Sequence, residues 1–217
     1  FLHKSISNLV SIQNELKSSL DQSSNPKIIA VSKTFPLEKI QPLIDHGHTH
    51  FGENKVQEAV DKWKRVKDRS NNIKLHMIGK LQTNKVKYVV PLFDYIHSLD
   101  NIKLAEKICK EQNKIKKFLK IFIQVNIGVE DQKSGIEPGN LKNFYNKCID
   151  EFKLDIIGLM CIPPQNNVEI YFSEMQKLNK LLKLKELSMG MSADYLQARK
   201  YGSSFVRIGS KIFGERS

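Results

Sequence analysis

From residue 27 onward the chain alternates short apolar runs with amphipathic stretches. Short runs rich in Val and Ile predict buried strands, whereas apolar positions that recur every three or four residues predict helices. The predicted strands span residues 27–32, 49–53, 74–78, 95–98, 119–126, 155–162, 186–189 and 205–209. The predicted helices that follow them span residues 37–46, 55–67, 83–90, 102–116, 139–152, 168–183 and 193–201.

Residues 1–20 have a helical pattern of their own, with leucine or isoleucine at positions 2, 6, 9, 16 and 20. We expect an amphipathic N-terminal helix packed on the body of the protein, because this segment lacks the continuous apolar core of a signal peptide. Three later helix starts carry their own signals: Asn101 as an N-cap, Pro138 in a first turn, and Ser192 with Asp194 before the last helix.

The order of these elements gives eight repeating units, a strand followed by a helix in each of the first seven and a strand in the eighth, without a linker rich in Pro, Gly or Ser. Strict alternation implies parallel strands joined by crossover helices. An open doubly wound sheet has a similar local pattern, but its dinucleotide-binding version places GxGxxG after the first strand, where this chain has none. The pattern therefore favours a single α/β domain over residues 1–217, a closed (β/α)8 TIM barrel.

Composition narrows the class of protein. Of the 217 residues, 40% are hydrophobic and 27% are charged, as is usual for soluble chains, and no stretch has the ~20 apolar residues that a membrane span needs. Cys109, Cys148 and Cys161 are far apart and have no CxxC spacing. They predict neither a disulfide framework nor a metal site, so we expect a cytoplasmic protein with reduced cysteines.

The formal charge of +12 raises nucleic acid as a partner. The excess comes mostly from lysines scattered over predicted helices, only five arginines occur, and the sequence has no basic patch interleaved with aromatic residues. Abundant Lys, Asn and Ile are also typical of an A+T-biased genome. We therefore expect neither a nucleic-acid partner nor a membrane partner.

Chemistry-bearing residues recur where the predicted strands end, which is the active-site face of such barrels. Lys33 follows the first strand, so it is either a lysine directed to solvent or an amine that forms a Schiff base with an aldehyde. The residues at the other strand ends are Gly52, Glu53, Asn54, His76, the segment 79–85, Ser98, Asn126, Met160, Pro163, Pro164, Gly190, Met191, Ser192, Arg207, Gly209 and Ser210.

The last two of these loops can hold an anion. Ser192 is predicted at a helix N-terminus, where unpaired backbone N–H groups favour negative charge. Gly209 and Ser210 add a close backbone approach and a hydroxyl at the position where barrels often bind phosphate. A plain N-cap or a tight turn explains each residue alone, but together they favour a phosphate site.

Arg207 lies within an otherwise apolar strand, two residues before Gly209. A buried arginine is costly unless it has a partner. The partner is either a carboxylate across the barrel mouth, Glu53 or Glu215, or the ring nitrogen of a ligand. A guanidinium would keep that nitrogen unprotonated, because it cannot readily give up a proton.

Five segments are informative together: AVSKT (30–34), FGENKVQE (51–58), HMIGKLQTNK (76–85), LSMGMS (187–192) and VRIGS (206–210). In this order they resemble the pyridoxal phosphate (PLP) homeostasis protein family, and the resemblance extends essentially from end to end. It implies a barrel similar to the N-terminal barrel of alanine racemase, which is PLP fold-type III, with an extra N-terminal helix.

The resemblance implies cofactor-binding roles for seven residues: Lys33, Asn54, Met191, Ser192, Arg207, Gly209 and Ser210. Lys33 would hold PLP covalently as an internal aldimine, with Asn54 beside the cofactor. Ser192, Gly209 and Ser210 would bind its phosphate, and Arg207 would face the pyridine nitrogen. The family often has Thr where this chain has Ser210, and the hydroxyl is retained.

Four further residues match family segments without a defined role: His76, Lys80, Lys85 and Lys133. For Lys85 and Lys133 a solvated surface position is the simpler explanation.

The resemblance also implies a function, which is PLP binding in intracellular PLP homeostasis, by buffering or delivery, with little or no catalysis. Alanine racemase takes its second acid–base group from a β-rich domain of another subunit, and this chain stops at Ser217, just after the eighth strand. We therefore expect no catalytic residues, a monomer, and PLP-dependent apo-enzymes as recipients. Two alternatives stay open: a single-domain PLP-dependent amino-acid racemase, and a Schiff-base aldolase acting on a sugar phosphate.

Overall fold

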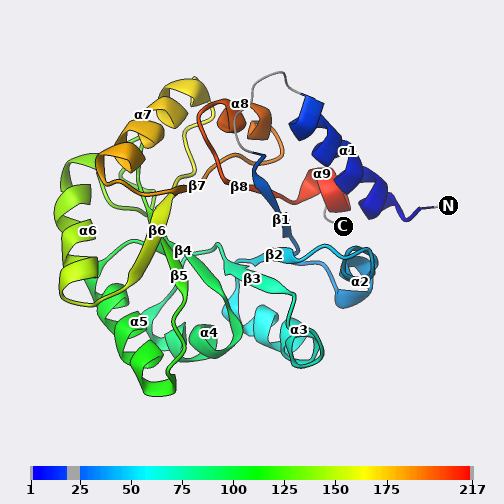
Figure 1. Cartoon of the computed structure of the whole chain (residues 1–217), viewed down its shortest axis with the longest axis horizontal. Coiled ribbons are helices and arrows are strands. Elements are labelled where there is room, and N and C mark those ends of the chain that lie inside the picture. Colours follow the sequence, from blue (N-terminus) through cyan, green and yellow to red (C-terminus); the bar gives the residue numbers. More distant parts are fainter. Residues whose placement is uncertain (1, 19–24, 216–217) are drawn as a thin grey trace.

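Eight parallel strands close into one barrel in the computed structural model, which describes residues 2–18 and 25–215 (Figure 1). The strands are β1 (Lys27–Val31), β2 (His50–Glu53), β3 (Lys74–Met77), β4 (Tyr95–Leu99), β5 (Lys120–Gln124), β6 (Asp155–Met160), β7 (Glu186–Ser188) and β8 (Phe205–Ile208). β8 returns to β1, with Lys27 opposite Phe205 and Ala30 opposite Ile208. The predicted TIM barrel is confirmed.

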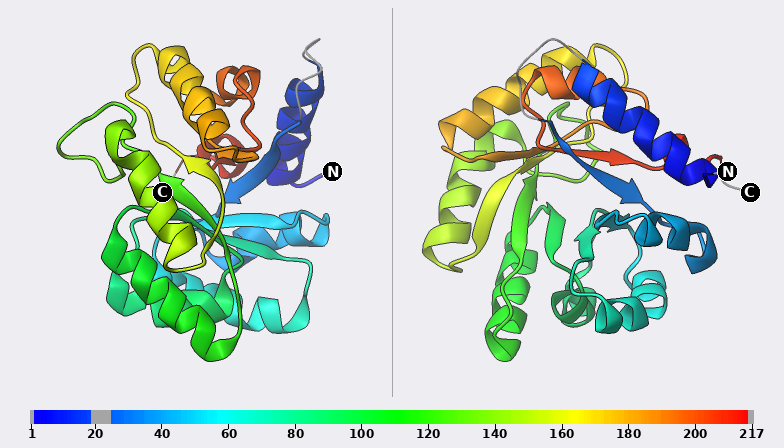
Figure 2. Two further views of the ribbon diagram at one scale, coloured as in Figure 1. Left: turned by 60° about the vertical axis from the view of Figure 1, so that its left-hand side comes forward. Right: turned by 45° about the vertical axis from the view of Figure 1, so that its right-hand side comes forward.

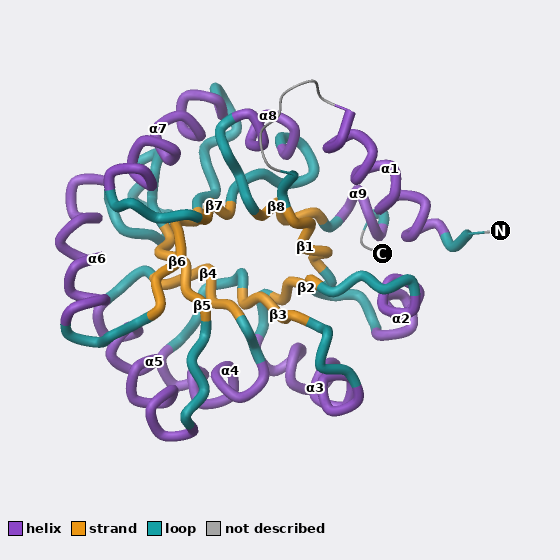
Figure 3. The backbone as a smooth tube through the Cα atoms, in the orientation of Figure 1, coloured by secondary structure: helices purple, strands orange, loops and turns teal. Residues whose placement is uncertain are grey.

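The helices form a ring around the strands (Figure 3). They are α1 (Lys4–Ser18), α2 (Leu37–Asp45), α3 (Val56–Arg69), α4 (Val86–Leu92), α5 (Ile102–Ile115), α6 (Leu141–Asp150), α7 (Val168–Leu181), α8 (Tyr195–Lys200) and α9 (Ser210–Phe213), with 3-10 turns η1 (Thr83–Lys85) and η2 (Pro138–Asn140) before α4 and α6. All strands but β4 are shorter than predicted, most of them by one residue, and β5 and β6 end two residues early because the chain leaves the sheet after Gln124 and Met160. The sequence pattern did not predict α9, because so short a helix shows no helical period.

Helix α5 shows how local sequence sets an element and its exit. The Asn101 side chain accepts a hydrogen bond from the Leu104 N–H at 2.9 Å, so the predicted N-cap is confirmed. Lys116 ends the helix in the left-handed conformation, with φ of 57°. Buried Gln112 then accepts a hydrogen bond from the Leu119 N–H at 2.7 Å, which directs the chain into β5.

The predicted N-terminal helix is present as α1, which packs on the outside of the barrel beside α9 and α2 (Figure 2). Its Glu15 carboxylate accepts hydrogen bonds from the Lys211 ammonium at 2.9 Å and from the Tyr195 hydroxyl. These contacts attach α1 to the two short helices that follow β7 and β8. Residues 1, 19 and 20 of the predicted helix lie outside the described residues.

The apolar core has two parts. The larger part lies between the strands and the ring of helices. The smaller part fills the barrel interior with Ile29, Tyr95, Phe122, Met160 and Phe205. Buried polar side chains share that interior: His76, His97, Ser188 and Arg207. Such a polar interior differs from the layers of branched aliphatic residues that usually fill these barrels.

The cysteines are packing residues. Cys109, Cys148 and Cys161 are free thiols, and burial raises the pKa of Cys148 and of Cys161 to about 12. Over residues 2–18 and 25–215, no helix is long and apolar enough to cross a membrane. In the same ranges, no three His, Cys, Asp or Glu side chains are grouped so that they could hold a metal ion.

Candidate functional site

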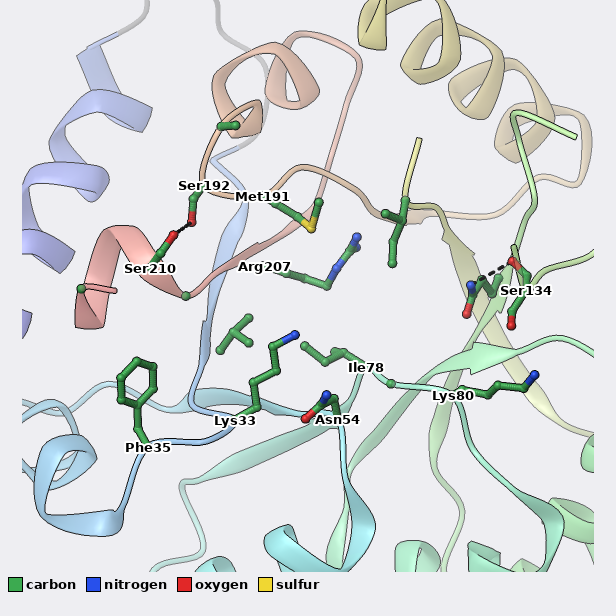
Figure 4. A pocket seen from close by; sticks show the side chains of 17 residues that line it. Lys33, Phe35, Asn54, Ile78, Lys80, Ser134, Met191, Ser192, Arg207 and Ser210 are labelled. Carbon is green, nitrogen blue, oxygen red and sulfur yellow. Dashed lines mark hydrogen bonds between the residues drawn. The ribbon is translucent and has the colours of Figure 1, made fainter. Parts of the chain in front are cut away.

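A pocket of about 540 Å³ opens at the carboxyl ends of the strands (Figure 4). All seven residues with implied cofactor roles line it: Lys33, Asn54, Met191, Ser192, Arg207, Gly209 and Ser210. They come from β8 and from the loops after β1, β2, β7 and β8. Parallel strands bring them together, because the carboxyl ends of all eight strands face the same side of the barrel.

Lys33 lies in a tight turn, two residues beyond the end of β1. Buried Ser32 donates its hydroxyl to Glu53 Oε1 at 2.7 Å on one side of the turn. On the other side Thr34, with φ of 68°, donates its N–H to Glu58 Oε1 at 2.6 Å. These two contacts fix the backbone around Lys33, so the half-buried lysine side chain is directed into the pocket (Figure 4).

Glu53 connects three elements beneath this turn. Its carboxylate is fully buried, and besides Ser32 its Oε1 atom accepts hydrogen bonds from Trp63 Nε1 at 2.8 Å and from Lys62 Nζ at 3.0 Å. Lys62 also donates to the Ser32 carbonyl at 2.9 Å. β1, β2 and α3 are therefore held together by one buried ion pair directly behind the loop that carries Lys33.

Asn54 follows β2 and lies against the loop after β3. A Cβ atom on Gly79 would lie 2.4 Å from the Asn54 carbonyl oxygen, so this close approach requires glycine. The Asn54 Oδ1 atom is buried and accepts no hydrogen bond from any described residue. A buried acceptor without a donor is unfavourable, and the Lys33 side chain lies beside it in the pocket (Figure 4). A ligand with a donor group at this point would satisfy Asn54.

Arg207 enters the pocket from β8 and is itself buried. Its NH1 group donates to the carbonyl oxygen and to the hydroxyl of Ser188, both at 2.7 Å, and its NH2 group donates to the Cys161 carbonyl at 2.8 Å. The alternative of a salt bridge to Glu53 or Glu215 is wrong, because these partners are all neutral oxygens. Burial lowers the pKa of Arg207, and the charge of nearby Asp194 opposes that shift. Arginine stays charged, and no carboxylate among the described residues hydrogen-bonds to it, so its positive charge faces the pocket.

The loops after β7 and β8 meet at the two serines of the predicted phosphate site. Ser210 Oγ lies 3.3 Å from Ser192 Oγ, across the mouth of the pocket (Figure 4). Gly190, with φ of 95°, packs against Ala198, where a Cβ atom would approach to 2.6 Å. The loop after β7 can therefore turn tightly only with glycine at this position.

The predicted position of Ser192 at a helix N-terminus is wrong. Helix α8 begins at Tyr195, and Asp194 accepts a hydrogen bond from the Met191 N–H at 2.6 Å instead of capping the helix. This side-chain bond closes a turn over residues 191–194, because aspartate competes for local backbone donors. Ser192 thus reaches the pocket from a turn, whereas Ser210 is the first residue of α9.

The four residues that matched the family without a defined role lie in different parts of the structure. Only Lys80 lines the pocket. His76 lies inside the barrel on β3, and Lys85 lies on η1, outside the pocket lining. Lys133 pairs with Glu130 at 2.5 Å.

The sequence did not indicate eight of the lining residues, all of them uncharged: Val31, Phe35, Ile78, Gln124, Ser134, Ile162, Ala193 and Gly214. Most lie close to a strand end, which is the signal that could have found them. Gln124 donates a hydrogen bond from its side-chain amide to the Ser134 carbonyl at 3.0 Å, so the loop after β5 forms one wall of the pocket.

The charge of the pocket is positive. Its ionisable lining residues are Lys33, Lys80 and Arg207, so the pocket suits an anionic ligand.

Residues 7–217 match the family model described as alanine racemase, N-terminal domain. The pyridoxal phosphate homeostasis protein of Aquifex aeolicus is 40% identical over 88% of this chain and 87% of its own length. That of Pasteurella multocida is 38% identical over 96% of both chains. The chain belongs to the pyridoxal phosphate homeostasis protein family. Within this family, the relative from Schizosaccharomyces pombe is 33% identical over 93% of this chain.

Solved structures agree with the family. PipY of Synechococcus elongatus, solved without and with PLP bound, aligns at TM-scores of 0.87 and 0.83 with 32% identity. The alignments cover 98% and 97% of this chain and 100% of PipY. Alanine racemase of Clostridium difficile, at 14% identity and a TM-score of 0.73, shares the fold over 57% of its length.

Proposed function

We propose that this chain binds PLP in the pocket at the carboxyl ends of the strands, with Lys33 joined to the aldehyde as a Schiff base. We further propose that it acts in PLP homeostasis, by buffering PLP or delivering it to PLP-dependent apo-enzymes. The names of the relatives and the PLP-bound structure of PipY support the ligand. The observation that matters most is that Lys33, Arg207 and the serine pair line one cationic pocket.

The residues fit PLP by their chemistry. A primary amine, Lys33, is the group that reacts with an aldehyde. The hydroxyls of Ser192 and Ser210 and the backbone at Gly209 can donate hydrogen bonds to phosphate. Unpartnered Asn54 Oδ1 belongs to a residue that lines the same pocket as Lys33. The volume of about 540 Å³ is in the range of small-molecule sites.

Arg207 would hold the ring nitrogen. Bound PLP acts as an electron sink whose strength depends on protonation of that nitrogen. Because arginine does not readily give up a proton, Arg207 would donate a hydrogen bond and leave the nitrogen unprotonated. The sink would then be weak, which supports binding over catalysis.

The pocket lining also supports a protein with little catalysis of its own. Racemisation and aldol chemistry both need positioned acid–base groups in addition to the Schiff-base lysine. Among the described residues that line the pocket there is no Asp, Glu, His, Tyr or Cys. Lys80 is the only other amine there, and its exposed side chain lies across the pocket from the serine pair (Figure 4). This lining disfavours the racemase and the aldolase.

Absorption of the PLP-treated protein tests the Schiff base. We expect a band near about 420 nm, and borohydride followed by peptide mapping should place the modification on Lys33. The Lys33→Ala variant should lose the band, whereas Lys80→Ala should keep it. Modification at another lysine would refute the assignment. Racemase and aldolase turnover near ordinary enzyme rates, roughly 1 per second or more, would refute the non-catalytic function.

Delivery is tested by mixing the PLP-loaded protein with a PLP-dependent apo-enzyme and following the activity of that enzyme. Activation faster than with the same concentration of free PLP supports delivery, and slower activation supports buffering.

We also propose that the protein is a monomer and that it is located in the cytoplasm, and the three free cysteines agree with a cytoplasmic location. A sedimentation mass of 25.0 kDa is the expected result.

A further inference from the structure

A chain of polar side chains runs through the barrel interior behind Arg207. Ser188 Oγ, which accepts from Arg207, lies 2.8 Å from His97 Nδ1. His97 Nε2 lies 2.9 Å from His76 Nδ1, and His76 Nε2 lies 2.8 Å from His50 Nδ1. The chain crosses from β8 through β7, β4 and β3 to β2, and thus from the pocket to the opposite end of the barrel.

The surroundings of this chain are aromatic. The His76 ring stacks on Tyr95 with centroids 4.2 Å apart, and the His97 ring stacks on Phe122 at 4.3 Å. Phe205 lies beside both imidazoles. His76 and His97 are fully buried, so each ring nitrogen there depends on a protein partner.

The three histidines of this hydrogen-bond chain, His50, His76 and His97, are neutral. Burial lowers the pKa of His76 and of His97 well below 6.5, with the Arg207 charge adding to the effect at His97. Burial also lowers the pKa of His50 to about 4. A neutral imidazole has one N–H donor and one bare acceptor nitrogen, so each ring has a direction.

Arg207 sets that direction. A guanidinium can only donate, so Ser188 Oγ accepts from it and keeps its own proton. The only other group within hydrogen-bond distance of this hydroxyl in the described chain is His97 Nδ1. Ser188 therefore donates to a bare Nδ1, which places the His97 proton on Nε2. By the same step His97 donates to His76, and His76 donates to His50.

We propose that Ser188 and His97 are positioning residues for Arg207, and that His76 and His50 complete a hydrogen-bond chain with a single direction that fixes the tautomer of His97. The chain holds the guanidinium in the orientation in which it meets the ring of a bound ligand. Its importance for PLP rests on the proposed function, whereas its direction follows from Arg207 alone. A proton on His97 Nδ1 would leave the Ser188 hydroxyl without an acceptor, and a proton on Nδ1 of His76 or His50 would place two N–H donors face to face.

Nuclear magnetic resonance tests the direction without PLP. Long-range ¹H–¹⁵N spectra of the ¹⁵N-histidine-labelled full chain report which ring nitrogen carries the proton. We expect His50, His76 and His97 each to be protonated on Nε2, with assignments from single His→Gln variants. A proton on Nδ1 of His76 or His97, or averaging between both nitrogens, would overturn the proposal. This result stands whether or not the protein binds PLP.

Matched variants test the positioning of Arg207. His97→Gln keeps an acceptor and a donor on a side chain of similar length, whereas His97→Met keeps neither. We expect His97→Met to weaken PLP binding about tenfold or more and His97→Gln to restore most of it, because without an acceptor at position 97 the Ser188 hydroxyl is no longer held with its oxygen toward Arg207. Equal affinity in the two variants would refute the positioning function.

A second pair controls for the loss of a buried hydroxyl. Ser188→Ala removes the link to His97, whereas Ser98→Ala removes a buried hydroxyl that has no hydrogen-bond partner among the described residues. Weaker PLP binding and altered ¹⁵N shifts of His97 in Ser188→Ala alone support the proposal. The same change in both variants would count against it. If the wild-type protein does not bind PLP, the proposed function fails. The ¹⁵N shifts would still show whether the hydrogen bonds from Ser188 to His50 run in the proposed direction.

Discussion

Ser188 accepts two hydrogen bonds from Arg207, one at its carbonyl oxygen and one at its hydroxyl, both at 2.7 Å. Both bonds run between neighbouring strands, so the orientation of the guanidinium depends on the register of β7 and β8, together with the bond to the Cys161 carbonyl just beyond β6. A rigid cation that forms no ion pair with a carboxylate in the described part of the chain is suited to a ligand ring that must be held in one protonation state.

The serine pair should recognise phosphate specifically. We expect Ser192→Ala and Ser210→Ala each to lower the affinity for PLP about fivefold to tenfold, because each removes one hydrogen bond to an anion. The affinity for pyridoxal, which has no phosphate, should stay the same. Spectroscopic titration with both ligands measures the two affinities. An equal loss for PLP and pyridoxal would contradict a phosphate site here.

Gly79 should be required for the position of Asn54. A methyl group at Gly79 would lie 2.4 Å from the Asn54 carbonyl, so Gly79→Ala must displace one of the two loops. We expect the free energy of unfolding to fall by about 1–3 kcal/mol, measured by urea denaturation, together with weaker PLP binding. Gly139→Ala is the control, because no atom lies within 4 Å of the added methyl. Equal effects at the two glycines would rule out this explanation.

The ion pair behind Lys33 should be important for stability. Glu53→Gln keeps the shape of the side chain but leaves the Lys62 ammonium, only 8% exposed, with Glu58 at 2.9 Å as its remaining carboxylate partner among the described residues. We expect a loss of about 1–3 kcal/mol in the free energy of unfolding, because hydrogen bonds to a charged acceptor are lost while the Lys62–Glu58 pair remains. The exposed pair of Lys110 and Glu106 is the control, and Glu106→Gln should cause no measurable change. A stable Glu53→Gln protein would show that the pair contributes little.

The stability of the protein should fall in mild acid. Burial lowers the pKa of His48 and of His50 to about 4, and those of His76 and His97 well below 6.5. In the unfolded chain these groups titrate near 6.5, so below that pH the unfolded state binds protons that the folded state does not. The free energy of unfolding should therefore decrease as the pH falls, by about 1.4 kcal/mol per pH unit for each histidine.

Urea denaturation at several pH values from about 7.5 down to about 5 measures how the free energy of unfolding changes with pH. Lys27 and Lys74 lie near His50 and oppose its protonation, while Asp94 favours it. The His97→Met variant should show a shallower slope, because one of the four histidines is missing. A flat profile over this range would contradict the neutral histidine chain.

Local sequence was sufficient for the barrel and for most of the pocket. Apolar runs that alternate with helical periods determine parallel strands and crossover helices, and every strand end then lies on one face. This is why Lys33 and Arg207, 174 positions apart in the sequence (207 − 33), could be expected in one pocket. Details that depend on a single turn were less predictable, as at Ser192, where the Asp194 side chain closes a turn before the helix begins.

The partners of buried polar groups were decided only by the tertiary structure. The sequence shows an arginine in an apolar strand, but not that its partners are Ser188 and Cys161 instead of a carboxylate. Likewise, His76 and His97 look like isolated histidines at strand ends in the sequence. They touch because closure of the barrel fixes the register between strands, and register is a property of packing across the whole sheet that no single segment encodes.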